Sequence, residues 1–171
     1  MQEVTTQIIN RTYFHTQRVI ILISILIFFL QGMPPNRPKE IFINPTGTYD
    51  LKSDTKKKDG DIYGYFGTVK VKLLQNSRIA MSFYICKGAP SYNSGSFVDT
   101  LNYHDNKVIR IPEDDPSCKL VFTFSKKEIT VVQQQKDLNF GCGFGHGVFA
   151  DGSYKKISSK IPLIEDQLLG Q

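Results

Sequence analysis

The residues best suited to chemistry gather in one glycine-rich segment, residues 141–147, which reads GCGFGHG. Its Cys142 and His146 are the residue types of cysteine nucleophiles and of zinc sites. A nucleophile also needs a group that orients its histidine, and zinc would need a fourth ligand beside Cys118, Cys142 and His146. The sequence indicates neither, and the glycine spacing does not fit a dinucleotide-binding loop. We therefore interpret the segment as a tight glycine loop with His146 at the surface.

The three cysteines, Cys86, Cys118 and Cys142, predict one disulfide and one remaining thiol in an exported chain. We expect Cys118 to pair with Cys142, because Cys118 opens a hairpin whose second strand ends near Gln134 and the next loop returns Cys142. A bridge that closes a loop of this length contributes about 3–4 kcal/mol through chain entropy. The alternative is three reduced, partly buried thiols.

The other titratable residues give little support for catalysis. Glu113, Asp114 and Asp115 are adjacent in one proline-bounded loop, whereas paired catalytic carboxylates come from opposing walls of a cleft. Three acids also do not supply the six oxygens that calcium requires. His104 falls in a predicted hairpin turn, exposed to solvent, and the sequence contains no nucleophile elbow, Walker loop or HExxH motif. The sequence therefore predicts neither an enzyme nor a bound cofactor or metal.

The best candidate for a binding segment is residues 87–95, which read KGAPSYNSG. The segment mixes a rigid proline, an amphipathic tyrosine and adaptable serine and asparagine side chains, a mixture suited to contact surfaces. The alternative is a plain connection between two strands. The candidate binding residues are Lys87, Pro90, Ser91, Tyr92 and Asn93.

The N-terminus is similar to an export signal. Residues 19–30, VIILISILIFFL, form an apolar run that is shorter than the roughly 20 residues of a membrane-spanning helix and suits the apolar region of a signal peptide. We expect residues 1–32 to be a signal peptide or an uncleaved signal anchor, with translation from Met33 as a further alternative. Residues 33–46 contain four prolines and form a spacer. The predicted location is periplasmic or extracellular, or membrane-anchored if residues 19–30 are not cleaved.

The composition predicts one small domain that is rich in strands. The 171 residues include 12 Phe and 8 Tyr but no Trp, which favours strands over helical bundles. The net charge of +5 falls short of the clustered basic density of a dedicated nucleic-acid binder, so we expect no nucleic-acid partner. We interpret the dense basic run, residues 56–58, as a solvated loop tip. The alternative for this run is electrostatic contact with an acidic partner.

Alternation of period two runs through residues 47–156, the predicted domain, and residues 157–171 form a tail with one helical turn at 164–169. About eight short strands predict a small antiparallel β-barrel, because closure removes exposed sheet edges. The alternative is a flattened β-sandwich. The expected strands are residues 48–51, 63–74, 78–86, 95–103, 107–111, 118–125, 128–134 and 148–156. The side chains expected in the core are Val69, Val71, Leu73, Ile79, Met81, Phe83, Ile85, Leu120, Phe122, Phe124, Ile129 and Val131.

Three segments carry a resemblance: GAPSYNSG at residues 88–95, CKLVFTFSKKEITV at 118–131 and CGFGHGVFADGSYKK at 142–156. They resemble a recurrent pattern in small exported bacterial β-barrel proteins with a C-terminal CGFGxGVxADGxYK motif. The resemblance spans the predicted domain and implies the same pairing of Cys118 with Cys142. The plan of a signal followed by a disulfide-stapled barrel is also similar to periplasmic lysozyme inhibitors. Their loop motif, Ser-Gly followed two residues on by Tyr, is not matched here, so no inhibitory residue is carried over.

Together these features predict an exported, non-enzymatic binding protein with an envelope or extracellular protein as its partner. The sharpest form of this prediction is an inhibitor of a cell-wall hydrolase. The alternative is a lipocalin-like carrier of a small apolar ligand, and a hydrolase is a remote alternative. A filled barrel with a projecting 87–94 loop would favour protein binding, whereas a Phe- and Ile-lined cavity above about 300 Å³ would favour a carrier.

Overall fold

The structure, a computed structural model, describes residues 41–136 and 141–166. The predicted export segment and most of the predicted spacer lie outside these residues. The described residues form strands and connecting segments, with no helix among them, and so contain no helix that could span a membrane. The strands are β1 (Gly47–Leu51), β2 (Lys56–Lys58), β3 (Asp61–Leu73), β4 (Arg78–Gly88), β5 (Ser94–Asn102), β6 (Lys107–Arg110), β7 (Lys119–Phe124), β8 (Glu128–Gln134) and β9 (Gly152–Ser158).

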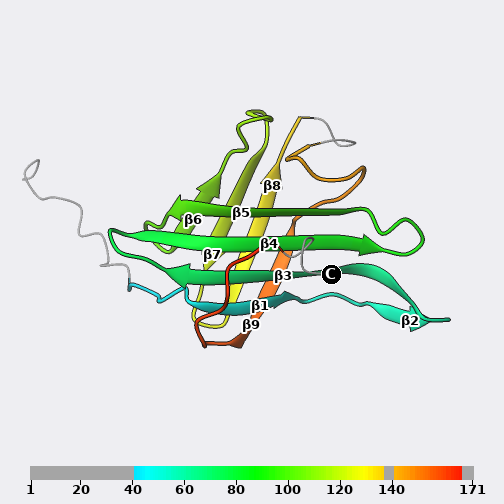
Figure 1. Cartoon of the computed structure of the whole chain (residues 1–171), viewed down its shortest axis with the longest axis horizontal. Coiled ribbons are helices and arrows are strands. Elements are labelled where there is room, and N and C mark those ends of the chain that lie inside the picture. Colours follow the sequence, from blue (N-terminus) through cyan, green and yellow to red (C-terminus); the bar gives the residue numbers. More distant parts are fainter. Residues whose placement is uncertain (1–40, 137–140, 167–171) are drawn as a thin grey trace, which may run out of the picture. The chain divides into compact units, whose positions relative to one another are not determined.

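Eight of these strands form one nearly closed antiparallel barrel, in the order β5-β4-β3-β1-β9-β8-β7-β6 (Figure 1). The first and last strands along the chain, β1 and β9, are neighbours in the sheet. β1 pairs with β3 on one side and with β9 on the other. The short β2 pairs only with β3, beyond the end of the barrel. The expected antiparallel barrel of about eight strands is therefore confirmed.

The barrel has one unsealed seam, between β5 and β6. A tight turn joins these strands, and His104 and Lys107 exchange backbone hydrogen bonds of 3.1 and 2.8 Å there. Asp105 and Asn106 both have positive φ in this turn, as a two-residue hairpin turn requires. Past the turn the described strands diverge without a further ladder, so the seam is crossed by side chains.

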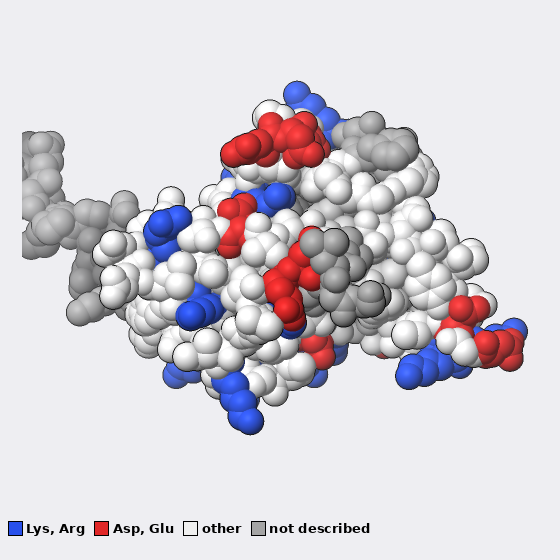
Figure 2. Space-filling model, in the orientation of Figure 1, with Lys and Arg blue, Asp and Glu red and all other residues white. Residues whose placement is uncertain are grey.

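On the face shown in Figure 2, charged side chains lie in separate patches on a largely uncharged surface. The C-terminal tail crosses the outer wall of the barrel, where Lys70 on β3 lies 3.6 Å from Glu165 and the Ser96 hydroxyl on β5 donates to Asp166 at 3.1 Å. These contacts hold the tail extended through Asp166. The predicted helical turn is therefore wrong for residues 164–166, and the rest of it lies outside the described residues.

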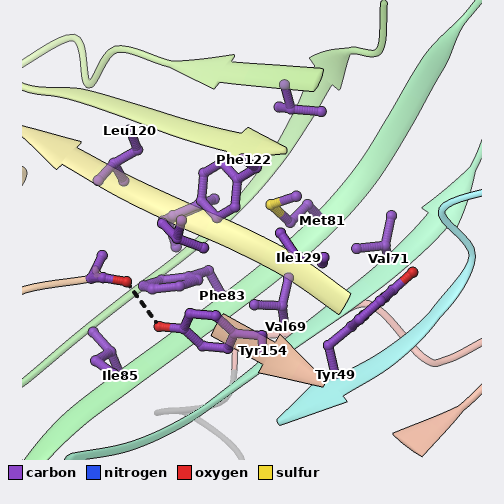
Figure 3. Packing of buried hydrophobic residues seen from close by; sticks show 14 of the residues in the cluster. Tyr49, Val69, Val71, Met81, Phe83, Ile85, Leu120, Phe122, Ile129 and Tyr154 are labelled. Atoms are coloured by element: carbon purple, nitrogen blue, oxygen red, sulfur yellow. Dashed lines mark hydrogen bonds between the residues drawn. The ribbon is translucent and has the colours of Figure 1, made fainter. Parts of the chain in front are cut away.

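Aromatic and aliphatic side chains together fill the inside of the barrel (Figure 3). Phe83 on β4 stacks on Phe97 and Phe144, with ring centroids 5.2 and 5.8 Å apart, and meets Phe122 edge-on at 5.8 Å. Tyr154 also contacts Phe83, and its hydroxyl donates to the Ala150 carbonyl at 3.1 Å. Burying one such ring stabilises the fold by about 1.5–3 kcal/mol. The two halves of the barrel are thus joined through one aromatic cluster.

The buried set agrees with the period-two prediction, with Leu73 as the exception. Leu73 is half-buried because it ends β3 at the rim. The basic run at residues 56–58 is a strand rather than a loop tip, although its side chains are exposed as expected. Asp59 and Gly60, both with positive φ, form the turn that returns it to β3.

The last strand begins later than predicted, at Gly152 rather than residue 148. The Gln133 side chain accepts a hydrogen bond from the Ala150 amide at 2.7 Å, and Asp151 accepts one from the Gln133 amide at 3.0 Å. These side-chain bonds replace the strand ladder before Gly152. The segment before β9 is therefore a fixed loop at one end of the barrel.

Candidate functional site

Two segments that the sequence singled out separately meet at one end of the barrel. The loop after β4, residues 87–94, lies against the glycine loop, residues 141–147. The Gly145 amide donates to the Ser94 carbonyl at 2.9 Å, and the Lys87 ammonium and the Asn93 amide both donate to the His146 carbonyl, at 3.2 and 2.9 Å. We call residues 87–94 and 141–147 together the double-loop surface.

Phe144 anchors this surface in the core. Its ring stacks on Phe83 and is buried. A Cβ atom placed on Gly95 would lie 2.1 Å from the Phe144 ring, far inside contact distance. Glycine at position 95 therefore leaves room for the Phe144 ring to close the end of the barrel. The buried ring in turn fixes the backbone of the glycine loop.

The disulfide holds the other side of the glycine loop. Cys118, just before β7, is bonded to Cys142, with Cα atoms 5.2 Å apart, which confirms the predicted pair. Cys142 has a positive φ of 64°, an unusual conformation for a non-glycine residue. Its amide donates to Asp115 at 2.8 Å. The loop is thus fixed covalently and by a carboxylate.

Asp115, in the predicted acidic loop, is hydrogen-bonded to this surface. The Ser117 hydroxyl donates to its carboxylate at 2.7 Å. This bond, followed by the one from the Cys142 amide, holds the pKa of Asp115 below its usual value of 3.8. The neighbouring Glu113 and Asp114 are exposed. Residues 41–136 and 141–166 contain no cluster of three or more His, Cys, Asp or Glu that could hold a metal.

Tyr92 is less free than its sequence position suggested. Its hydroxyl donates to Asp61 at 2.9 Å and accepts the Ile62 amide at 2.9 Å, both at the start of β3. The Ile62 amide lowers the pKa of Tyr92, but desolvation and the Asp61 carboxylate outweigh it and raise the pKa overall. With a φ of 51° and an exposed fraction of 39%, Tyr92 is a fixed aromatic side chain with one open face.

Cys86, the remaining cysteine, lies beneath the 87–94 loop. It is free and buried. Its thiol lies 3.6 Å from the Tyr92 carbonyl, and the Gly88 amide donates to its sulfur at 3.4 Å. It points to the opposite side of β4 from the barrel core, as the alternation predicted, and the loop covers it. The 87–94 loop therefore covers the thiol and makes only weak contacts with it.

All five predicted binding residues lie on the double-loop surface, with Pro90, Ser91 and Tyr92 exposed and Lys87 and Asn93 half-buried. The sequence reasoning missed that His146, exposed as predicted, and Asp61 belong to the same end. The sequence did show two loops of unusual composition, but the alternation of apolar and polar residues does not reveal which loops come together in the fold.

The remaining predicted candidate, His104, lies in the β5–β6 turn at the opposite end of the barrel, exposed as expected. Antiparallel strands place this turn with the start of β1 and the end of β9. The histidine and the double-loop surface therefore do not form one site. No known protein family, curated protein or solved structure matches this chain.

Proposed function

We propose that this protein is a non-enzymatic, exported binding protein that docks onto an envelope or extracellular protein through the double-loop surface. The observation that carries the proposal is the cross-bonding of the two loops through the His146 carbonyl, together with the disulfide at Cys142. A surface that is already ordered loses little conformational entropy on binding. The exposed Pro90, Ser91 and Tyr92 present a rigid, partly apolar contact area.

The packing of the barrel interior favours this function over that of a carrier. Phe83, Phe97, Phe122 and Phe144 fill the region where a lipocalin-like protein would hold its ligand. The hydrolase alternative loses its nucleophile, because the Cys142 thiol is consumed in the disulfide. Contact through a surface is the mode of action that these residues support.

The disulfide also supports an oxidising compartment. Such bonds persist mainly outside the reducing cytosol, and Cys118 and Cys142 are bridged here. Together with the apolar run at residues 19–30, this supports export to the periplasm or the extracellular space. Inhibition of a cell-wall hydrolase is the sharpest form of the proposal, since such enzymes act in that compartment.

The test uses a photo-crosslinking amino acid in place of Ser91, in the full chain expressed in its native host. The matched control places the same group at Thr130, an exposed residue on the outer wall of β8. We expect position 91 to give one discrete crosslinked protein that position 130 does not give. In a separate co-purification, Ser91→Arg should abolish binding of that partner. Crosslinks of equal pattern from both positions, or none from position 91, would contradict the proposal.

A further inference from the structure

The end of the barrel opposite the double-loop surface carries a basic groove of about 490 Å³. It lies between the β7–β8 turn, with Lys126 and Lys127, and the end of β9, with Lys155 and Lys156. Glu128 is the acid among its lining residues, and its carboxylate accepts the Ser153 hydroxyl at 3.0 Å. Four lysines against one glutamate give the groove a positive field that favours an anionic surface.

Exposed apolar side chains stand at the same end. Ile157, which lines the groove, is 60% exposed, and Ile41 and Phe42, where the described chain begins, are 72% and 64% exposed. We call these three residues and the four groove lysines the basic rim. A soluble acidic ligand would not require large apolar groups beside the lysines, whereas a lipid surface offers both phosphates and acyl chains.

Hydrogen bonds fix the beginning of the described chain at this end. Asn106 accepts the Ile43 amide at 2.8 Å and donates to the Ile41 carbonyl at 2.9 Å. The Phe124 amide donates to the Asn106 carbonyl at 2.8 Å, two residues before the groove begins at Lys126. The Lys156 ammonium also donates to the Asn44 carbonyl at 3.5 Å. Hydrogen bonds therefore connect the segment that carries the apolar residues of the rim to the strands that carry its lysines.

The charge pattern on the visible face agrees with this assignment. Figure 2 shows basic side chains at the left and along the lower edge of this face, and a further group at the far right. Acidic side chains lie mainly toward the top, the centre and the far right of that view. At the double-loop end the exposed lysines of residues 56–58 stand beside Asp59 and Asp61, and the acidic loop lies at the same end. Anionic lipid headgroups would therefore be attracted more at the end that carries the groove.

The sequence connects this end to the apolar run. Residues 31–40 alone separate that run, residues 19–30, from Ile41. Ten residues span at most about 33–36 Å when fully extended. An apolar run associated with a membrane would therefore keep the basic rim within that reach of the lipid surface.

We propose that the basic rim docks onto an anionic phospholipid surface, with the lysines over the phosphates and Ile41, Phe42 and Ile157 entering the headgroup layer. The double-loop surface, at the other end of the barrel, then faces away from the membrane. Docking at the rim is independent of the partner proposed for the loops, so either proposal can fail without the other.

The absence of tryptophan from the sequence permits a local optical test. Ile157→Trp places the single tryptophan of the full chain on the rim, and Val132→Trp, on the outer wall of β8, is the control at a position that is 43% exposed. The probes are phosphatidylcholine vesicles with and without phosphatidylglycerol. We expect Ile157→Trp to shift its emission to the blue and to be quenched by brominated acyl chains only with the anionic vesicles. Equal responses to both vesicles, or from both variants, overturn the proposal.

Matched charge variants test the lysines. Lys126, Lys127 and Lys155 are changed to Gln together, and the control changes Lys56, Lys57 and Lys58, which are exposed at the other end, to Gln. Net charge and the N-terminal run are the same in both. We expect the rim variant to bind anionic vesicles at least about tenfold more weakly than the control. Equal losses in both variants would show a general charge effect and overturn the proposal.

The apolar part of the rim is tested with Ile157→Ser. We expect it to weaken binding to anionic vesicles as well, because a polar side chain gains nothing from the headgroup layer. If the lysine change matters and Ile157→Ser has no effect, the groove serves a soluble polyanion, and the lipid assignment is wrong.

Discussion

The Arg110 Nε atom on β6 lies 3.3 Å from the Asp99 Oδ2 atom on β5, so an ion pair crosses the one seam that the barrel backbone leaves open. The same guanidinium lies 4.1 Å from the centre of the Phe97 ring. Arginine is suited to this position because its flat group stacks on an aromatic face while it donates to a carboxylate. One side chain, Arg110, therefore bridges the seam through two contacts.

Arg110→Ala should lower the free energy of unfolding by about 1–2 kcal/mol, because it removes both the stacking on Phe97 and the ion pair. Asp99→Asn should lower it by less than about 1 kcal/mol, because that carboxylate is partly exposed and screened. Chemical denaturation of the two variants measures both effects. Equal losses would show that the ion pair, rather than the stacking, holds the seam.

The disulfide should stabilise the double-loop end strongly. Cys118→Ser combined with Cys142→Ser should lower the free energy of unfolding by about 2–4 kcal/mol, because the bridge closes a loop that the unfolded chain would otherwise leave free. Cys86→Ala should change it much less, since that thiol makes only weak contacts. Peptide mapping without reduction should find Cys86 unlinked, and any bridge to Cys86 would contradict the assignment.

Gly95→Ala should destabilise the protein by about 1–3 kcal/mol, the usual effect of overpacking. The new methyl group would collide with the Phe144 ring. Thermal unfolding measures the loss, and the double variant with Phe144→Ala identifies its cause. Gly95→Ala should lower the stability of the Phe144→Ala protein by less than it lowers the stability of the wild-type protein. An equal loss in both proteins would place the strain elsewhere.

Tyr92→Phe should loosen the 87–94 loop without unfolding the barrel. It removes the bonds to Asp61 and to the Ile62 amide but keeps the ring. We expect faster hydrogen exchange at the Ile62 amide and a loss of less than about 1.5 kcal/mol in global stability. Ser91→Ala, on the same loop, is the control. Unchanged exchange would show that Tyr92 does not fix the loop.

The glycine loop should loosen in acid. The pKa of Asp115 is lower in the folded protein than its usual 3.8, so its contribution is fully present above that value and is lost as the pH falls through the lowered pKa. Hydrogen exchange or the chemical shift of the Cys142 amide, measured against pH below 3.8, follows this change. Asp115→Asn should remove the step. A step that persists in the variant would belong to another carboxylate.

Period-two alternation was enough to predict the strands and their buried faces, because inward positions such as Val69 and Val71 must be apolar wherever the strand pairs. Closure into a barrel was inferred separately, from the need to remove exposed sheet edges. Alternation of apolar and polar residues cannot reveal a strand whose side chains are exposed on both faces, so the β-strand at Lys56–Lys58 was missed. It also carries no information about which loops meet. The contact between Lys87 and His146 depends on barrel closure, and the pairing of β1 with β9 that closes it has no local signal.

That pairing has a consequence for how the molecule folds while it is being made. The strands β1 to β5 precede β6 to β9 along the chain, yet Phe83 of the first half packs on Phe122 and Tyr154 of the second. While the chain is being made, the apolar face of β1 to β5 stays uncovered until β6 to β9 have followed. Non-local contacts of this kind form slowly and expose the chain to aggregation. The apolar face of the first half is therefore fully covered only when β9, the final strand, joins the barrel.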